Sequence, residues 1–346
     1  MKNLFFAALS MTLLLNTGCG EQPTALLSIS VDRPDKTVAL KASDLMEAPE
    51  YVALETNDSC LIKRNPSFYA TDDYIVSIAK RQIFLFDRKT GRFIREIGKA
   101  GQGPDEYQFT TSALPVDYER RTIAASGSKG LMRYDFEGRL VDQVASVPDK
   151  FMPDIAEVAP DLFAGYLFNS PEKLLLFNRQ GEVKRFFPNY NVSEAMAMAV
   201  PYHGYYRQGA NIYLCEWFND TIFTVLPDAL VPHIVLERGA HQLSMERLAR
   251  GESKEMHFPL TAYESSHFLF HTYAFDGQPY LFVYDKRSHE GVLNQKADLI
   301  ADDFERRGAM RLSTVDGERF VGYIAAEEAT ALGEEDNPIV VISKLK

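Results

Sequence analysis

The stretch YIVSIAKRQIFLFDRKTGRFIREIGKAGQGPDEY, residues 74–107, contains the plan that the rest of the chain repeats. Two alternating apolar runs follow a first apolar run, short turns join them, and a glycine-rich loop comes last. In the middle run Ile83 and Leu85 fall on one side and Phe84 and Phe86 on the other, as in a β-strand. The Lys-Thr-Gly turn after this run predicts a hairpin. A sheet of three or four strands cannot bury both of its faces alone, so the pattern predicts stacked copies.

Further copies of the plan follow along the chain, and their spacing is typical of propeller blades. The last copy lacks an outer strand, whereas the N-terminal segment 36–56 contains strands without partners. We therefore predict an all-β fold, a six-bladed β-propeller closed by an N-terminal strand that joins the last blade. We expect a few short helical insertions, at 242–255, 294–307 and 327–336. The middle strands should centre near residues 85, 133, 176, 224, 283 and 341, with innermost strands at 61–70, 113–118, 154–159, 198–207 and 258–265.

The N-terminus reads as an export signal. Lys2 precedes an apolar run that is too short to span a bilayer, and small residues then lead to Cys19. This ending resembles the lipobox of bacterial lipoproteins, in which the cysteine becomes the first, lipid-bearing residue; an incidental thiol is the alternative. A lipid on Cys19 would hold the protein on a membrane without crossing it. We divide the chain into a lipoprotein signal peptide (1–18), a tether (19–35) and the propeller domain (36–346).

Composition limits the partners. The formal net charge is −11 at pH 7. An acidic surface argues against nucleic acid, because phosphate binding needs clustered cations, and against adhesion to anionic headgroups. We expect membrane contact through the lipid anchor only, and a monomer. Cys60 and Cys215 are the other cysteines; we expect both to be small core residues, although the sequence leaves open whether they pair.

The glycine-rich loop has two interpretations. A phosphate-binding loop needs backbone N–H groups that lead into a helix. Here a proline removes one donor and two acidic residues repel phosphate, so we interpret the loop as a structural connection between blades, with its glutamate bonded to backbone. The residues of this structural loop are Gly98, Gly101, Gly103, Pro104, Glu106 and Tyr107.

Three features resemble the six-bladed β-propeller lipoproteins of Bacteroidetes, which have NHL-like and TolB-like blades. They are the Cys19 motif, the loop IGKAGQGPDEY at 97–107 and the ending DNPIVVISKLK at 336–346. In that family the loop usually reads G-x-G-P-G-E-[FY], and here Asp105 stands where the second glycine is usual. The resemblance covers the mature chain. It implies the fold and a place in the cell envelope, at the outer membrane facing the periplasm or the surface, but no reaction.

Two groups of residues are candidates for ligand binding. The alternative for both groups is that their side chains pack in the core or between blades. His267 and His271 lie four residues apart, on one face of a strand or helix. No further metal-ligand motif accompanies them, so we expect no metal and no cofactor; a zinc-dependent propeller lyase is the alternative. The second group lies in the fourth copy, where aromatic residues stand beside Arg and His, as at binding surfaces. The candidate ligand-binding residues are Tyr202, His203, Tyr205, Arg207, Trp217, His267 and His271.

No catalytic constellation is evident, since the chain has no Gly-x-Ser-x-Gly, and we assign no catalytic residue. Paired carboxylates for sugar hydrolysis remain open, because their separation is invisible in sequence. We therefore expect an envelope-anchored, non-catalytic binding or scaffold protein that holds a protein, peptide or glycan at the channel mouth. The alternative is a propeller enzyme, a hydrolase or lyase with its site in the central channel.

Overall fold

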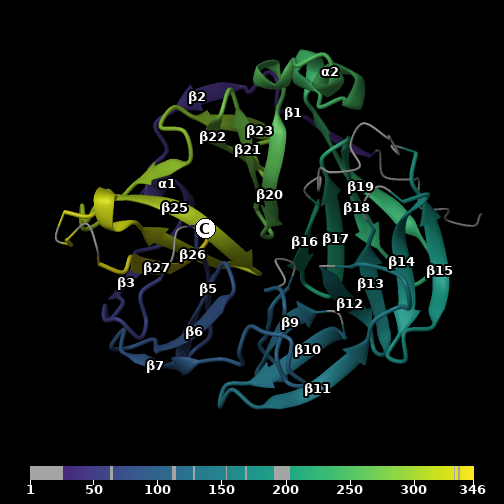
Figure 1. Ribbon diagram of the computed structural model, residues 1–346. Coiled ribbons are helices and arrows are strands. Elements are labelled where there is room, and N and C mark those ends of the chain that lie inside the picture. The colour runs from purple at the N-terminus through teal and green to yellow at the C-terminus, as the bar shows by residue number, and fades with distance from the viewer. Residues whose placement is uncertain are drawn as a thin grey trace, which may run out of the picture.

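The strands form six sheets arranged around a common axis, which confirms the six-bladed β-propeller (Figure 1). Each sheet has four or five strands, and successive strands within a blade are antiparallel. The computed structural model describes residues 26–62, 65–110, 114–127, 129–152, 154–167, 170–190, 203–330, 332–333 and 336–346.

Blades 1 to 3 each consist of four strands that follow one another in sequence from the centre to the rim. Blade 1 contains Ser67–Ala70 (β4), Tyr74–Ala79 (β5), Gln82–Asp87 (β6) and Phe93–Glu96 (β7). Blade 2 contains Val116–Asp117 (β8), Thr122–Gly127 (β9), Gly130–Asp135 (β10) and Leu140–Ala145 (β11). Blade 3 contains Ile155–Ala159 (β12), Leu162–Tyr166 (β13), Glu172–Asn178 (β14) and Val183–Pro188 (β15).

Blades 4 to 6 include strands from the N-terminal segment. Blade 4 contains His203–Gln208 (β16), Asn211–Glu216 (β17), Asn219–Val225 (β18) and Leu230–Glu237 (β19), with Leu27–Ser30 (β1) at its edge. Blade 5 contains Phe258–Glu264 (β20), Phe268–Phe275 (β21), Gln278–Asp285 (β22) and Glu290–Asn294 (β23), with Lys36–Val38 (β2) at its edge. Blade 6 contains Ala309–Asp316 (β25), Arg319–Ile324 (β26), Ile339–Lys344 (β27) and Glu50–Ala53 (β3), and Leu299–Ala301 (β24) pairs with β25.

The N-terminal segment closes the ring as predicted, because β3 pairs antiparallel with β27 and completes blade 6. The same segment also runs along the rims of the two preceding blades, where β1 pairs parallel with β19 and β2 parallel with β23. The predicted tether, 19–35, is therefore too long. Its last part belongs to the fold, because β1 satisfies the outer backbone groups of β19.

Helices are few and short, as predicted: Ala42–Leu45 (α1), Met245–Ala249 (α2) and the 3₁₀ turns Gly239–His241 (η2), Ser253–Glu255 (η3) and Ala326–Glu328 (η4). The helical prediction for 294–307 is wrong. This segment contains the turn between β23 and β24, and β24 buries Ile300 completely in the core between blades 5 and 6. The Asn294 amide fixes the turn by donating to the backbone oxygen of Leu299 (2.8 Å). Of 327–336, the described residues contain only the end of η4.

The two faces of each blade pack against different neighbours. In β6, Ile83 and Leu85 lie in a cluster shared with blade 2, whereas Phe84 and Phe86 lie in a cluster shared with blade 6. The same division holds in β14, β22 and β27, and six buried clusters fill the six seams between blades. Burial on both faces explains why both sets of alternating positions are apolar in the middle strands.

The cysteines do not pair. Cys60 is buried between blades 6 and 1 and Cys215 between blades 4 and 5, and both are free thiols. Within the described ranges, no helix combines the length and the apolar character needed to cross a membrane. The same ranges contain no group of three or more His, Cys, Asp or Glu side chains arranged to hold a metal ion.

Candidate functional site

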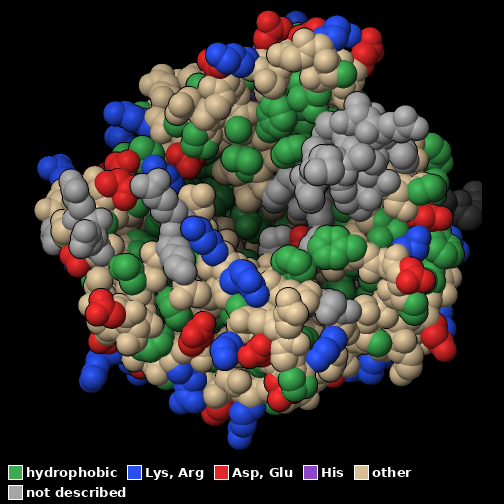
Figure 2. Space-filling view, in the orientation of Figure 1, with side chains coloured by type: hydrophobic (Ala, Val, Ile, Leu, Met, Phe, Trp, Pro, Cys, Tyr) green, Lys and Arg blue, Asp and Glu red, His purple; other side chains and the backbone are tan. Residues whose placement is uncertain are grey.

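A cavity of about 240 Å³ lies on the axis of the ring, between the inner strands. Five blades contribute to its wall, through β4, β8, β16, β20 and β25 or the residues beside them. In the space-filling view the molecule is hollowed at its centre, with hydrophobic side chains on the wall and Lys or Arg side chains at the edge (Figure 2). The cavity is lined by Tyr69, Leu114, Val116, Asp117, Tyr118, Glu119, Tyr206, Arg207, Gly209, Tyr263, Thr314, Val315 and Asp316.

The repeated strand order places these side chains at one end of the channel. All blades have the same order, so their inner strands run in the same direction. The lining residues that belong to inner strands lie among the last three residues of those strands, such as Tyr263 in β20 and Asp316 in β25. The cavity is therefore the mouth of the channel on the side where the inner strands end.

Tyrosines form much of the cavity wall. Burial raises the pKa of Tyr118 and Tyr263 well above the ordinary value. Neither hydroxyl makes a hydrogen bond within the described part of the chain, so both can bond to a molecule in the cavity. Tyr206 differs, because its hydroxyl donates to the Glu264 carboxylate at 2.9 Å.

Opposite charges stand at the same mouth. Arg207 is exposed and makes no hydrogen bond or ion pair with any described residue. Burial raises the pKa of Asp316, and the charges of Arg319 and Arg207 oppose this shift. The Arg319 guanidinium is already engaged, since it pairs with Asp72 at 3.1 Å and donates to the backbone oxygen of Ala70. Among the described residues of the cavity wall, Arg207 is therefore the cation that remains available to a ligand.

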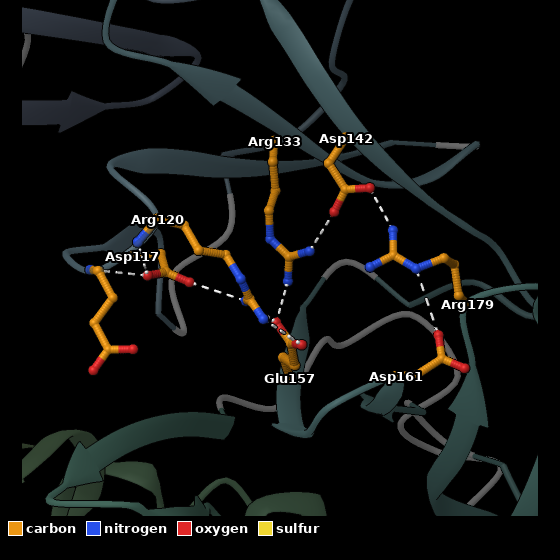
Figure 3. Close-up of polar contacts among 8 residues, drawn as sticks. Asp117, Arg120, Arg133, Asp142, Glu157, Asp161 and Arg179 are labelled. Carbon is orange, nitrogen blue, oxygen red and sulfur yellow. Dashed lines mark hydrogen bonds and ion pairs between the residues drawn. The ribbon is translucent and has the colours of Figure 1, made fainter.

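A chain of ion pairs begins at the cavity wall and enters the seam between blades 2 and 3 (Figure 3). Asp117 accepts from Arg120 at 3.1 Å, and Arg120 reaches Glu157 at 2.5 Å. Glu157 also accepts from Arg133 at 2.6 Å. The side chain of Arg133 is only 6% exposed. Because Asp117 is paired in this way, it is not a free anion of the cavity.

The same chain continues along the seam to β11, the outer strand of blade 2, and to two turns of blade 3 (Figure 3). Arg133 donates to Asp142 at 2.7 Å, Asp142 also pairs with Arg179, and Arg179 lies 3.5 Å from Asp161. Burial raises the pKa of Asp142, but the hydrogen bonds from the two guanidinium groups outweigh burial and hold that pKa below its usual range. Both guanidinium groups also lie over the Phe163 ring, at 5.7 and 6.0 Å from its centroid.

A second polar network lies behind Tyr206, in the seam between blades 4 and 5. Its centre is Glu264, whose side chain is 1% exposed and which pairs with Lys286 and with the Nε2 atom of His233, each at 2.7 Å. Burial raises the pKa of Glu264, but the bond from His233 and the charge of Lys286 outweigh it and lower the pKa below its usual range. The ring of Tyr206 is therefore held firmly in the cavity wall.

The sequence matches, over residues 26–344, the family described as "Domain of unknown function (DUF4934)". The chain belongs to the DUF4934 family. Among solved structures it is similar to a protein of Bacteroides fragilis NCTC 9343 described as exported, with a TM-score of 0.69 and 17% identity over 93% of this chain and 99% of that one. It is also similar to a DUF4221 family member from Bacteroides vulgatus ATCC 8482, with a TM-score of 0.57 and 12% identity over 87% and 97% of the two chains.

These structural similarities show the propeller fold in the DUF4934 chain and nothing finer, because the identities are low. No curated protein sequence matches it. The NHL-like and TolB-like character of the blades stays a prediction. The lipid on Cys19 also stays one, since Cys19 lies outside the described residues.

The predicted binding residues of the fourth copy separate in this DUF4934 structure. Arg207 lines the cavity, but Tyr205 is buried in the cluster between blades 3 and 4. His203 begins β16 and lies at the opposite end of that strand from the cavity. Tyr202 lies outside the described residues, and nothing is described of the His203 side chain.

The other predicted binding residues lie away from the cavity wall. Trp217 joins blades 4 and 5, because its indole N–H donates to the backbone oxygen of Pro259 at 2.9 Å. His271 is fully buried in β21, where burial lowers its pKa to about 3 and Nδ1 lies 3.0 Å from the backbone oxygen of Thr261. His267 is half-buried just before β21. Their surroundings are those of packing residues.

The glycine-rich loop connects blades 1 and 2. Glu106 accepts from the backbone N–H of Gly103 at 2.8 Å, and a Cβ at Gly101 would lie 1.9 Å from its carboxylate. Gly98 has a φ of +59°. Tyr107 is fully buried and its hydroxyl donates to the backbone oxygen of Arg81 at 3.1 Å, while Pro104 lies in the turn before Glu106. The loop also borders a shallow surface hollow of about 580 Å³, lined by residues of β7 and β10 rather than by inner strands.

Sequence reasoning missed most of the cavity. Tyr69, Tyr118, Tyr206 and Tyr263 were not selected, although each lies at or near the end of an inner strand in a different blade. An alignment of the copies at their inner strands would have shown this shared tyrosine. Asp316 gave no comparable signal, because it stands in an ordinary Asp-Gly turn.

Proposed function

We propose that this DUF4934 protein is an exported, non-catalytic binding module that holds a ligand in the channel mouth. One observation carries the proposal: five blades converge on a cavity whose wall includes two phenol hydroxyls without a hydrogen bond, and a guanidinium without a hydrogen bond or ion pair, among the described residues. A closed ring of blades keeps such groups at fixed positions before the ligand arrives, which lowers the entropic cost of binding.

The proposal includes an address in the cell envelope, with the lipid on Cys19 as anchor. The signal-like N-terminus supports it, and the relative from Bacteroides fragilis is described as exported. In the native host, a Cys19→Ala variant should leave the membrane fraction and lack the N-terminal lipid mass that intact-mass spectrometry detects in the parent. Equal membrane association of both proteins would contradict the anchor.

Binding is tested with the purified chain from residue 20 onward, screened by thermal shift and calorimetry against short peptides and oligosaccharides. The double variant Tyr118→Phe, Tyr263→Phe removes only two hydroxyls and should lower the affinity of any ligand found by about tenfold or more. Tyr190→Phe is the matched control, because Tyr190 is 87% exposed and outside the cavity. An unchanged affinity in the double variant, or no ligand from either class, would oppose the proposal.

Glycoside hydrolysis is the second candidate function. Three carboxylates, of Asp117, Glu119 and Asp316, line the same cavity, and burial raises the pKa of Asp316, as a general acid requires. Release of reducing sugar from oligosaccharides by the parent, and its loss in Asp316→Asn, would favour this function. Binding without release in both proteins would favour the non-catalytic module.

A further inference from the structure

The free charges of the cavity belong to neighbouring parts of the ring. Arg207 stands on β16 of blade 4, Tyr263 on β20 of blade 5 and Asp316 on β25 of blade 6. The order of the blades therefore places a tyrosine between a cation and an anion along the cavity wall. Asp316 lies close enough to Arg207 for the guanidinium to favour its ionised form.

Two other charged side chains near the cavity wall are already in ion pairs within the protein. Asp117 is bonded to Arg120, and Arg319 is bonded to Asp72. Glu119 and Arg207 are exposed and have no ion pair in the described ranges, and Asp316 is half-buried. Among the described residues that line the cavity, the charges that remain for a ligand are the Arg207 guanidinium on blade 4, the Asp316 carboxylate on blade 6 and the Glu119 carboxylate on blade 2.

This arrangement selects among ligand classes. A neutral ligand would use neither charge of the cavity, and a purely anionic one would face two carboxylates. A purely cationic ligand would face Arg207. A molecule with one carboxylate and one ammonium group meets both charges, with charge-assisted hydrogen bonds at each end.

We propose that the channel mouth binds a zwitterion, a free amino acid or a short peptide, with the ligand carboxylate on Arg207 and its ammonium group at Asp316. The phenol groups of Tyr118 and Tyr263 then bond to the ligand's polar atoms between these two ends. The cavity of about 240 Å³ is smaller than the roughly 300 Å³ at which pockets for drug-sized molecules begin, so the ligand has one or two residues. This inference rests on the proposed binding function.

The test uses calorimetry with three probes, L-alanyl-L-alanine, its N-acetyl derivative and its C-terminal amide. The parent protein should bind the free dipeptide at least tenfold more tightly than either capped form. Arg207→Gln should lose at least tenfold in affinity for the free dipeptide and no longer distinguish it from the amide. Asp316→Asn should no longer distinguish it from the N-acetyl form. Arg185→Gln, an exposed arginine on β15, is the matched control and should behave like the parent.

Several outcomes would overturn the inference. Capped and free dipeptides that bind equally well would remove the role of the two charges, as would an unchanged preference in both cavity variants. Tight binding of a neutral oligosaccharide that the Tyr118→Phe, Tyr263→Phe variant loses would refute the zwitterion but keep the binding function. No binding of any of these probes or oligosaccharides would count against both. Thermal unfolding of each variant checks that the fold is intact.

Discussion

Two seams of the ring differ in the polar groups that they bury. Between blades 2 and 3, Arg133 is surrounded by carboxylates, and every charge in the chain of ion pairs has a partner of opposite sign (Figure 3). Between blades 4 and 5, the interior contains neutral rings beside the ion pair of Glu264 and Lys286: His271, Tyr273 and His257 follow one another, with centroids 5.7 and 4.3 Å apart. A buried guanidinium, Arg238, stands beside them and donates to the backbone oxygens of Trp217 and Asn219.

Both seams must bury polar side chains between two sheets, and the stability of each seam should depend on pH in a different way. The seam between blades 2 and 3 is stable while its carboxylates are ionised. The seam between blades 4 and 5 is stable while His257 and His271 are neutral, and the His257 Nδ1, His271 Nε2 and Arg238 Nε atoms have no hydrogen-bond partner among the described residues. Acidification should therefore affect the second seam first, through His257 and His271, whereas the first seam should respond to the loss of Arg133.

Acidification from pH 7 to pH 5 should have the largest effect, a loss of about 4 kcal/mol in the free energy of unfolding, about 2 kcal/mol for each of His257 and His271. Burial lowers the pKa of both from 6.5 to about 3. Between pH 6.5 and pH 3, these two histidines are therefore protonated in the unfolded chain but neutral in the folded chain. The stability that they contribute above pH 6.5 is lost as the pH falls toward 3. Urea unfolding at both pH values measures the loss.

The control for this prediction is His271→Asn, whose amide can still donate to the backbone oxygen of Thr261. The variant should lose only about half as much stability as the parent between pH 7 and pH 5. In the seam between blades 2 and 3, the pKa of Asp142 is below its usual range, so its contribution is complete above pH 4 and is lost only below that. Equal stability of the parent at pH 7 and pH 5 would remove the proposed difference between the seams.

Removal of Arg133 should cost about 3 kcal/mol, the lower end of the range for breaking a buried ion pair, because Asp142 is 30% exposed. Arg133→Met keeps an aliphatic side chain in the seam and leaves Asp142 and Glu157 without their shared cation. Urea unfolding at pH 7 measures the cost. The variant should also lose less stability than the parent below pH 4, since Asp142 loses one of the two guanidinium groups that lower its pKa. A cost below 1 kcal/mol would show that water replaces the guanidinium.

Removal of Arg120 should have the smallest effect, less than about 1 kcal/mol, because its side chain is 52% exposed although it contacts two carboxylates. The Arg120→Ala variant should differ from the parent in 50 mM salt and approach it in 1 M salt, where exposed charges are screened. A cost similar to that of Arg133→Met would mean that burial does not decide the strength of this ion-pair chain.

Local sequence patterns were enough to predict most of the fold. The alternation around Phe84 and Phe86 predicted strands buried on both faces, and the copies predicted six blades. The turn at Gly91 followed from its sequence; its φ is +69°, and a Cβ there would lie 1.9 Å from the backbone oxygen of Ala53. The helical prediction for segment 294–307 is wrong because its polar residues are spaced as in a helix, whereas Ile300 is buried in the core between blades 5 and 6. Tertiary burial outweighs local propensity in so short a segment.

Much less of the candidate site could be predicted from the sequence. The sequence predicts Arg207 as a binding residue for its aromatic neighbours, yet Tyr205 and Trp217 pack between blades, and of the candidates in that group whose side chains are described only Arg207 lines the cavity. Whether a side chain on an inner strand faces the channel or a neighbouring blade depends on the tilt and closure of the ring, to which every blade contributes. The direction in which such a side chain faces therefore cannot be predicted from one stretch of sequence.

The amino-acid sequence by itself determined the number of blades, their strands and the strand that closes the ring, because these follow from alternation and turn chemistry within a few residues. Only the tertiary structure decided which charges are paired and which remain free. Arg120 and Arg207 look alike in sequence, but one meets Glu157 of the next blade and the other stands at an open mouth. Their difference arises from contacts between residues far apart in the chain, which exist only once the ring is closed.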